Sequence, residues 1–144
     1  MGVSKGSATG GKHVGKIRVV LADDHQAMIA RVREMLGDEF EVVEEADNGD
    51  KAVTSVLALD PDVLVTDISM PLVNGLEAAR TIHEANRRTK IIFLTIHEDP
   101  DFIAAALSTG AMGYVAKPRL STDLVFAIHE ALKGHIFVSN SRRI

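Results

Sequence analysis

The feature that most constrains the fold is an alternation of short apolar runs with longer segments in which apolar residues recur at helical spacing. The apolar runs occupy residues 17–22, 40–46, 62–67, 90–95 and 112–116, and helices are predicted over residues 26–36, 49–59, 75–86, 100–109 and a last segment that ends at Gly134. Strand–helix pairs in strict order are typical of a doubly wound α/β fold, with helices on both faces of a parallel sheet. The sequence therefore predicts a five-stranded parallel sheet.

Local signals mark the ends of several predicted helices. Asp99 offers an N-cap and Pro100 occupies the first helical position, a combination that starts helices. Ser121 is predicted to cap the last helix, and Gly37 to end the first one.

Polar side chains follow four of the apolar runs, at the point where each predicted strand ends. Asp23 and Asp24 come after the first run, Asp67 ends the third, Thr95 ends the fourth and Lys117 follows the fifth. Because the carboxyl ends of parallel strands meet at one edge of the sheet, we expect these side chains to converge there.

The predicted cluster suits phosphoryl transfer to a carboxylate. Three neighbouring carboxylates repel one another unless a cation compensates their charge, and an all-oxygen ligand set favours Mg²⁺. Asp67 would be the nucleophile, while the metal and Lys117 would stabilise charge on the transferring oxygens. The residues thus predict an aspartyl phosphate.

Each of these residues also has an ordinary structural interpretation when it is taken alone. Asp67 could cap a strand end, and the pair Asp23–Asp24 could cap the first helix. Thr95 could be a plain strand residue, and Lys117, before Pro118, a solvated residue of a turn. The hypothesis of a shared site rests on their joint placement at separate strand ends.

Residues 17–138 resemble the receiver domain of two-component response regulators. The matching segments are VVLADDHQAM, EEADNGDKAV, PDVLVTDISMPLVNGLEAAR, IIFLT and GAMGYVAKP. The resemblance implies a flavodoxin-like (βα)5 fold with strand order 2-1-3-4-5. It also implies that the chain is a signalling domain rather than an enzyme, one that assists its own phosphorylation and dephosphorylation.

The resemblance also implies roles for individual residues. Asp67 would be the phosphoacceptor, and Mg²⁺ would be held by Asp23, Asp24, Asp67 and the backbone carbonyl of Ser69. Thr95 and Lys117 would bind the phosphoryl oxygens, Tyr114 would be the aromatic switch residue, and the bond between Lys117 and Pro118 would be cis.

Three residues near the predicted site depart from the common pattern or flank it. Ile96 is bulkier than the small residue that many receivers carry there, and Ser69 and His97 lie two residues beyond Asp67 and Thr95. One hypothesis is that they tune the lifetime of the phosphoryl group. The alternative is that Ser69 and His97 are exposed loop residues of no consequence.

The NarL/LuxR-type subfamily is the most similar one, through ADDH, LTIHED, LKGHIFVS and Arg119, which replaces the Phe of the winged-helix regulators. This resemblance implies a cytoplasmic protein, a histidine kinase as phosphodonor, a possible homodimer on phosphorylation, and DNA binding only through a C-terminal helix-turn-helix domain. Residues 139–144 would then be a C-terminal tail or the start of a linker. The alternative is a stand-alone receiver that acts as a phosphorelay intermediate or adaptor.

Competing protein classes lack parts of this pattern. A dehalogenase-type phosphatase needs an acid two residues beyond its nucleophile, where this chain has Ser69. A flavodoxin needs a Ser/Thr- and Gly-rich phosphate loop after its first strand, where this chain has two Asp residues. A pseudo-receiver would lack one of the five predicted site residues, all of which are present.

Composition limits the remaining possibilities. The 144 residues include no Cys, which excludes disulfides and thiolate sites, and the net charge of −4 gives the chain no electrostatic reason to bind nucleic acid by itself. No apolar run approaches the roughly 18 residues that would span a membrane. The remaining histidines show no metal-ligand spacing and are interpreted as surface or tail residues: His13, His25, His83, His129 and His135.

Residues 1–16 are rich in Gly and Lys and are predicted to be a flexible tail. Gly6, Gly11 and Lys12 have the spacing of a phosphate-binding loop, but His13 replaces the Ser or Thr that would reach Mg²⁺ and no strand precedes it. The sequence therefore does not support a P-loop.

Overall fold

The computed structural model describes residues 15–86 and 88–139, so most of the predicted N-terminal tail, with its P-loop-like spacing, and residues 140–144 lie outside the described part. The strands are β1 (Ile17–Ala22), β2 (Phe40–Ala46), β3 (Val63–Thr66), β4 (Lys90–Thr95), β5 (Gly113–Ala116) and β6 (Phe137–Val138). The helices are α1 (Gln26–Leu36), α2 (Gly49–Leu59), α3 (Gly75–Ala85), α4 (Pro100–Leu107) and α5 (Leu120–Leu132). The predicted alternation of strands and helices is confirmed.

The sheet is parallel and has the order β2-β1-β3-β4-β5-β6. The first five strands follow the predicted order, but the prediction of five strands was wrong, because β6 pairs with the outer edge of β5. With two residues, β6 is too short to produce a recognisable apolar pattern. Its existence depends on the edge that the rest of the sheet provides.

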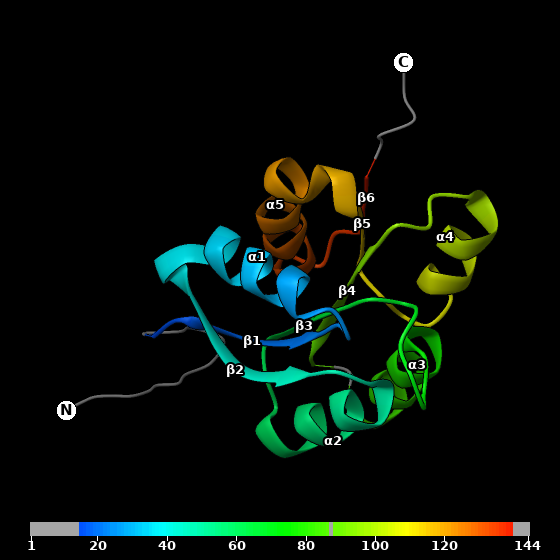
Figure 1. Ribbon diagram of the computed structural model, residues 1–144, viewed down its shortest axis with the longest axis horizontal. Coiled ribbons are helices and arrows are strands. Elements are labelled where there is room, and N and C mark those ends of the chain that lie inside the picture. Colours follow the sequence, from blue (N-terminus) through cyan, green and yellow to red (C-terminus); the bar gives the residue numbers. More distant parts are fainter. Residues whose placement is uncertain (1–14, 87, 140–144) are drawn as a thin grey trace.

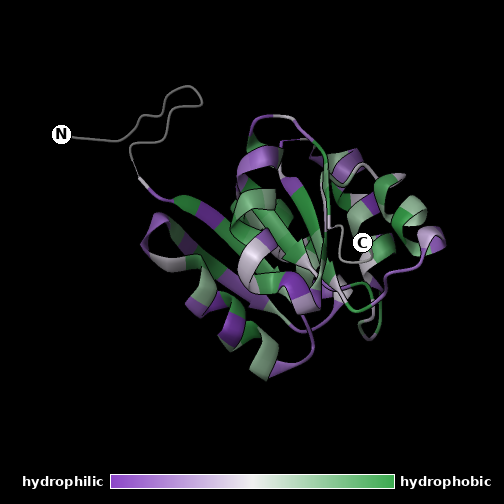
Figure 2. Cartoon of the chain, turned by 90° about the horizontal axis from the view of Figure 1, so that it is seen from above, coloured by the Kyte–Doolittle hydropathy of each residue, from purple (hydrophilic) through white to green (hydrophobic). Residues whose placement is uncertain are grey.

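The helices form a layer on each face of the sheet, with α1 and α5 on one side and α2 and α3 on the other, as Figure 1 shows. Two apolar clusters fill the spaces between sheet and helices. The inner strands are mainly hydrophobic in Figure 2, as expected for strands covered on both faces. This double burial holds the strands rigidly, so their ends can position a site.

Of the two helix starts predicted from capping signals, the structure confirms one. The Asp99 side chain accepts a hydrogen bond from the Phe102 N–H at the start of α4, which confirms the predicted cap. The prediction of Ser121 as a cap was wrong: α5 begins at Leu120, directly after a 3-10 turn over Lys117–Arg119. Arg119 occupies the N-cap position of α5, and no side chain caps this helix.

The peptide bond between Lys117 and Pro118 is trans, so the cis bond implied by the resemblance was wrong. The trans form of an X-Pro bond is intrinsically favoured by about 0.5–1 kcal/mol, and the 3-10 turn at Lys117 is compatible with it.

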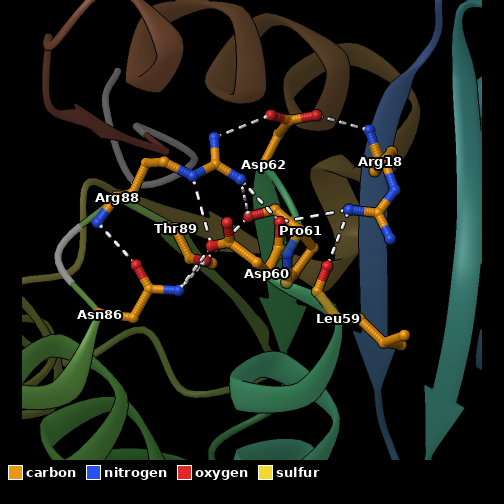
Figure 3. Close-up of polar contacts among 8 residues, drawn as sticks. All are labelled: Arg18, Leu59, Asp60, Pro61, Asp62, Asn86, Arg88 and Thr89. Carbon is orange, nitrogen blue, oxygen red and sulfur yellow. Dashed lines mark hydrogen bonds and ion pairs between the residues drawn. The ribbon is translucent and has the colours of Figure 1, made fainter. Parts of the chain in front are cut away.

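A polar network ties together the sheet edge opposite to the predicted site (Figure 3). The Arg88 guanidinium donates to the Asp60 carbonyl at 2.6 Å and to the buried Asp62 carboxylate at 3.2 Å. Asp62 also accepts from the backbone N–H of Arg18 on β1 at 2.8 Å. A hydrogen bond from Asn86, and the nearby Arg88 charge, lower the pKa of Asp60. The network fixes the loops that enter β3 and β4.

None of the helices described within residues 15–86 and 88–139 has both the length and the apolar character needed to span a bilayer.

Candidate functional site

A lysine and two carboxylates meet at the carboxyl edge of the sheet. Lys117 Nζ lies 3.1 Å from Asp23 Oδ2 and 3.1 Å from Asp67 Oδ2. All three side chains are nearly buried, with exposed fractions of 11%, 6% and 6% respectively. Burial opposes the charge on Lys117, but hydrogen bonds and charge attraction from Asp67 and Asp23 outweigh it and raise the pKa of Lys117. The predicted convergence of these residues is confirmed.

The strand pairing explains why Asp67 and Asp23 are neighbours. β1 and β3 are adjacent and in register, and the Asp67 N–H donates to the Ala22 carbonyl at 3.0 Å. Asp67 Oδ1 accepts from the Ile68 N–H at 2.7 Å, which leaves Oδ2 for Lys117. The fold therefore orients one carboxylate oxygen of Asp67 toward the lysine.

A glycine allows the chain to approach Asp67 closely. Gly75, at the start of α3, donates its N–H to the Ile68 carbonyl at 2.7 Å. A Cβ at this position would lie 2.0 Å from the Asp67 carbonyl oxygen, far inside van der Waals contact. Only Gly can therefore hold the loop that follows Asp67 against α3.

The acidic group extends to Asp24 and to a residue whose contacts were not predicted. His25 Nδ1 lies 3.1 Å from Asp23 Oδ1 and 3.2 Å from Asp24 Oδ1. One ligand atom from each of Asp23, Asp24, His25 and Asp67 lies within 4.8 Å of the others. His25 is exposed, as predicted. Its contact with the two carboxylates was not predicted, although its position directly after two Asp residues was a signal for it. Of the other histidines, His135 is exposed, His83 and His129 are half-buried, and His13 lies outside the described residues.

The start of α1 excludes one alternative interpretation of the acidic pair. His25 occupies the N-cap position of α1, and no side chain caps this helix. The Asp23 carboxylate accepts instead from the His25 N–H, at 2.9 Å, in a tight turn before the helix. The pair therefore faces the cluster and does not serve as a helix cap.

The donor set fits a hard divalent cation. Carboxylate oxygens of Asp23, Asp24 and Asp67 are available, and three acidic groups with one Lys leave an excess of negative charge for a cation to balance. Beside them, an open cleft of about 510 Å³ is lined by Asp24 and by residues of the loop that follows Asp67, including Ser69. The cleft leaves Asp24 and the loop after Asp67 open to solvent.

Thr95 and Tyr114 lie on the neighbouring strands and share one contact partner. The Thr95 hydroxyl accepts from the His97 N–H at 3.3 Å, and the Tyr114 hydroxyl donates to the His97 carbonyl at 2.6 Å. Tyr114 is 1% exposed, and burial, followed by the nearby carboxylates, raises its pKa to about 12. The loop after β4 therefore connects the two predicted switch residues through the backbone of His97.

The His97 ring contacts two residues that line this cleft, Ser69 and Phe102. Its Nε2 lies 3.1 Å from the Ser69 hydroxyl, and its ring stacks on Phe102 of α4 with centroids 4.2 Å apart. Sequence position flagged Ser69 and His97 but not their contact or the role of Phe102. Ile96, between Thr95 and His97, points outward and is 69% exposed.

Comparison with known proteins places this arrangement in a family. Residues 19–129 match the family described as the response regulator receiver domain. The chain is 37% identical over 125 residues to the transcriptional regulatory protein DegU of Brevibacillus brevis, covering 85% of this chain and 53% of DegU. The chain thus spans about half the length of that relative.

Solved structures give the same result. The receiver domain of the putative regulator NarL from Mycobacterium tuberculosis superposes with a TM-score of 0.79 at 32% identity, covering 84% of this chain and 99% of that one. A LuxR-family regulator from Aurantimonas sp. SI85-9A1 gives 0.83 at 30% identity, covering 88% and 92%. The predicted similarity to NarL/LuxR-type regulators is confirmed. The chain belongs to the response regulator receiver domain family.

Proposed function

We propose that Asp67 accepts a phosphoryl group from the phosphohistidine of a histidine kinase. The observation that carries the proposal is the buried contact of Lys117 with both Asp67 and Asp23 at the carboxyl edge of the sheet. An Asp67 carboxylate oxygen forms the new bond to phosphorus, while the bond from phosphorus to the histidine nitrogen breaks and that nitrogen keeps the electron pair. Lys117 then balances charge on the transferred oxygens.

We further propose that Mg²⁺ is held by Asp23, Asp24, Asp67 and the backbone carbonyl of Ser69. The three carboxylates supply hard oxygen ligands in one pocket, which supports this assignment. The bound cation would neutralise charge on the transferring phosphoryl oxygens. Without a cation, Lys117 offsets part of the negative charge through its contacts with Asp23 and Asp67.

Thr95 and Tyr114 are proposed to report the state of Asp67. The Thr95 hydroxyl would move toward the phosphoryl group, and Tyr114, whose hydroxyl bonds to His97, would fill the space that Thr95 leaves. Because both residues bond to the backbone of His97, a shift of one changes the contacts of the other. The surface formed by α4, β5 and α5 would change with them.

Ser69 and His97 are proposed to set the lifetime of the phosphoryl group. Their side-chain contact, 3.1 Å long, spans the loops that follow Asp67 and Thr95, where a hydrolytic water would approach. Ile96, which is exposed and directly precedes His97, is included in this proposal. The double variant Ser69→Ala with His97→Ala should lose its phosphoryl group faster than the wild type. An unchanged dephosphorylation rate would contradict this assignment.

The proposed partners rest on the similarity to known regulators. We propose a cytoplasmic receiver domain over residues 17–138 and a linker starting at residues 139–144. The linker would lead to a helix-turn-helix domain that provides DNA binding, and the receiver would dimerise on phosphorylation. The support is the similarity to DegU, a transcriptional regulatory protein of which this chain spans 53%.

The test is the intact mass of the chain after incubation with acetyl phosphate and Mg²⁺. The wild type should gain the mass of one phosphoryl group, and the gain should disappear when EDTA replaces Mg²⁺. Asp67→Asn is the matched variant, since it preserves the side-chain size and removes the nucleophile. No gain in the wild type, or an equal gain in Asp67→Asn, would overturn the proposal.

A further inference from the structure

The chain that leaves α5 returns to the sheet and covers the open edge of β5. Phe137 donates its N–H to the Met112 carbonyl at 3.0 Å, and Ser139 donates its N–H to the Tyr114 carbonyl at 2.8 Å. An uncovered sheet edge exposes a row of unpaired backbone groups. The segment of residues 136–139, which we call the exit segment, therefore satisfies backbone groups of β5 that no other described strand reaches.

The Ser139 hydroxyl continues this edge beyond β6. It accepts from the Ala116 N–H at 3.1 Å and donates to Asp123 Oδ2 at 2.7 Å. Asp123 is buried on α5 and also receives Arg119 Nε at 2.9 Å. Burial alone would raise the pKa of Asp123, but hydrogen bonds from Arg119, Ser139 and Thr122 outweigh it and lower the pKa. Ser139 thus bridges the end of β5 to a carboxylate that is held ionised.

An aromatic contact holds the other end of the exit segment. The Phe137 ring meets Phe126 of α5 edge to face, with centroids 5.4 Å apart. Aromatic pairs of this geometry add about 0.5–1.5 kcal/mol beyond their buried area. The exit segment is therefore attached both to β5 and to α5.

The residues of β5 that hold the exit segment are next to those of the candidate site. Tyr114, whose carbonyl binds Ser139, carries the hydroxyl bonded to His97. Ala116, whose N–H binds the Ser139 hydroxyl, directly precedes Lys117, which bridges Asp23 and Asp67. A displacement of either residue reaches Ser139 through one hydrogen bond.

We propose that the exit segment is an output latch: Ser139 holds the outgoing chain on β5, and phosphorylation of Asp67 releases it. This inference rests on the proposed function, because the release requires Lys117 to follow the phosphoryl group and draw the end of β5 away from Ser139. The structure assigns Ser139 as the positioning residue of the latch. The signal would then pass along the chain as a weaker attachment of Ser139 to β5.

The first test asks whether the latch exists and is independent of phosphorylation. Site-resolved amide hydrogen exchange of the full chain should show the Ala116 and Ser139 amides exchanging about tenfold faster in Ser139→Ala, as expected for the loss of a hydrogen bond that stabilises by about 1.4 kcal/mol. Ser139→Thr, which keeps the hydroxyl, should retain the protection. Ser108→Ala is the matched control, since that hydroxyl bonds to the Ala105 carbonyl near the end of α4. Unchanged exchange in Ser139→Ala would overturn the latch.

The second test asks whether phosphorylation releases the latch. Acetyl phosphate and Mg²⁺ should raise the exchange rates of the Phe137 and Ser139 amides about tenfold in the wild type and not in Asp67→Asn. The intact mass of the same sample reports whether a phosphoryl group was gained. Unchanged exchange in a phosphorylated sample overturns the release and leaves the proposed function standing. Absence of the mass gain overturns the proposed function and the release together, while the first test still decides whether Ser139 holds the chain.

Discussion

Raising the pH offers a direct test of the inward position of Tyr114. This residue is the sole Tyr in a chain without Trp, so the tyrosinate absorbance reports one side chain. Burial, together with the nearby carboxylates Asp99, Glu98 and Asp67, raises its pKa from 10.0 to about 12. A shift of about two pKa units corresponds to a roughly hundredfold smaller ionisation constant than that of an exposed tyrosine.

The sign of the effect on stability follows from the raised pKa. Neutral Tyr114 is favoured in the folded state, so its contribution is fully present below pH 10 and is lost as the pH rises from 10 toward 12. The absorbance midpoint should therefore lie near 12 and should coincide with any alkaline unfolding seen by circular dichroism. In Tyr114→Phe the absorbance change should vanish, which provides the baseline. A midpoint near 10 with the circular dichroism of the folded chain intact would refute the inward position.

The remaining predictions concern the site and the opposite edge of the sheet. Gly75→Ala forces a Cβ against the backbone, so it should destabilise the fold by about 1–3 kcal/mol or more and impair phosphoryl gain. In the control Gly15→Ala the new Cβ meets nothing within 4 Å, so neither quantity should change. Urea unfolding measures the stability and intact mass measures the phosphoryl gain. Lys117→Met leaves two buried carboxylates without their ammonium and should lower the free energy of unfolding by about 3 kcal/mol in EDTA, with a larger Mg²⁺-dependent recovery than in the wild type. Arg88→Ala removes contacts at the far edge and should cost about 1–3 kcal/mol in urea unfolding while phosphoryl gain on Asp67 stays unchanged.

The sheet and the centre of the site followed from the sequence because two strong rules apply to them. Alternating apolar runs and helical periods fix the order of elements, and parallel strands bring their carboxyl ends together. These rules predict that Asp23, Asp67 and Lys117 lie at one edge of the sheet. The contacts of 3.1 Å between Lys117 and the two carboxylates confirm the placement.

The features that were missed depend on contacts between distant segments. Ser139 and β6 owe their position to the free edge of β5, which a short local pattern does not reveal. The contact of His97 with Ser69 joins residues 28 positions apart, and the stacking of His97 on Phe102 depends on how α4 is placed. The start of α5 was wrong because the 3-10 turn before it replaced the expected cap at Ser121.

The most direct test of the central claim is to identify the residue that carries the phosphoryl group. Chemical reduction with borohydride converts an aspartyl phosphate to homoserine, which marks the modified position permanently for peptide mass analysis. After treatment with acetyl phosphate and Mg²⁺, the account predicts homoserine at Asp67 in the wild type and no homoserine in Asp67→Asn. Homoserine at Asp23 or Asp24, or a borohydride-resistant phosphoryl group elsewhere in the chain, would contradict it.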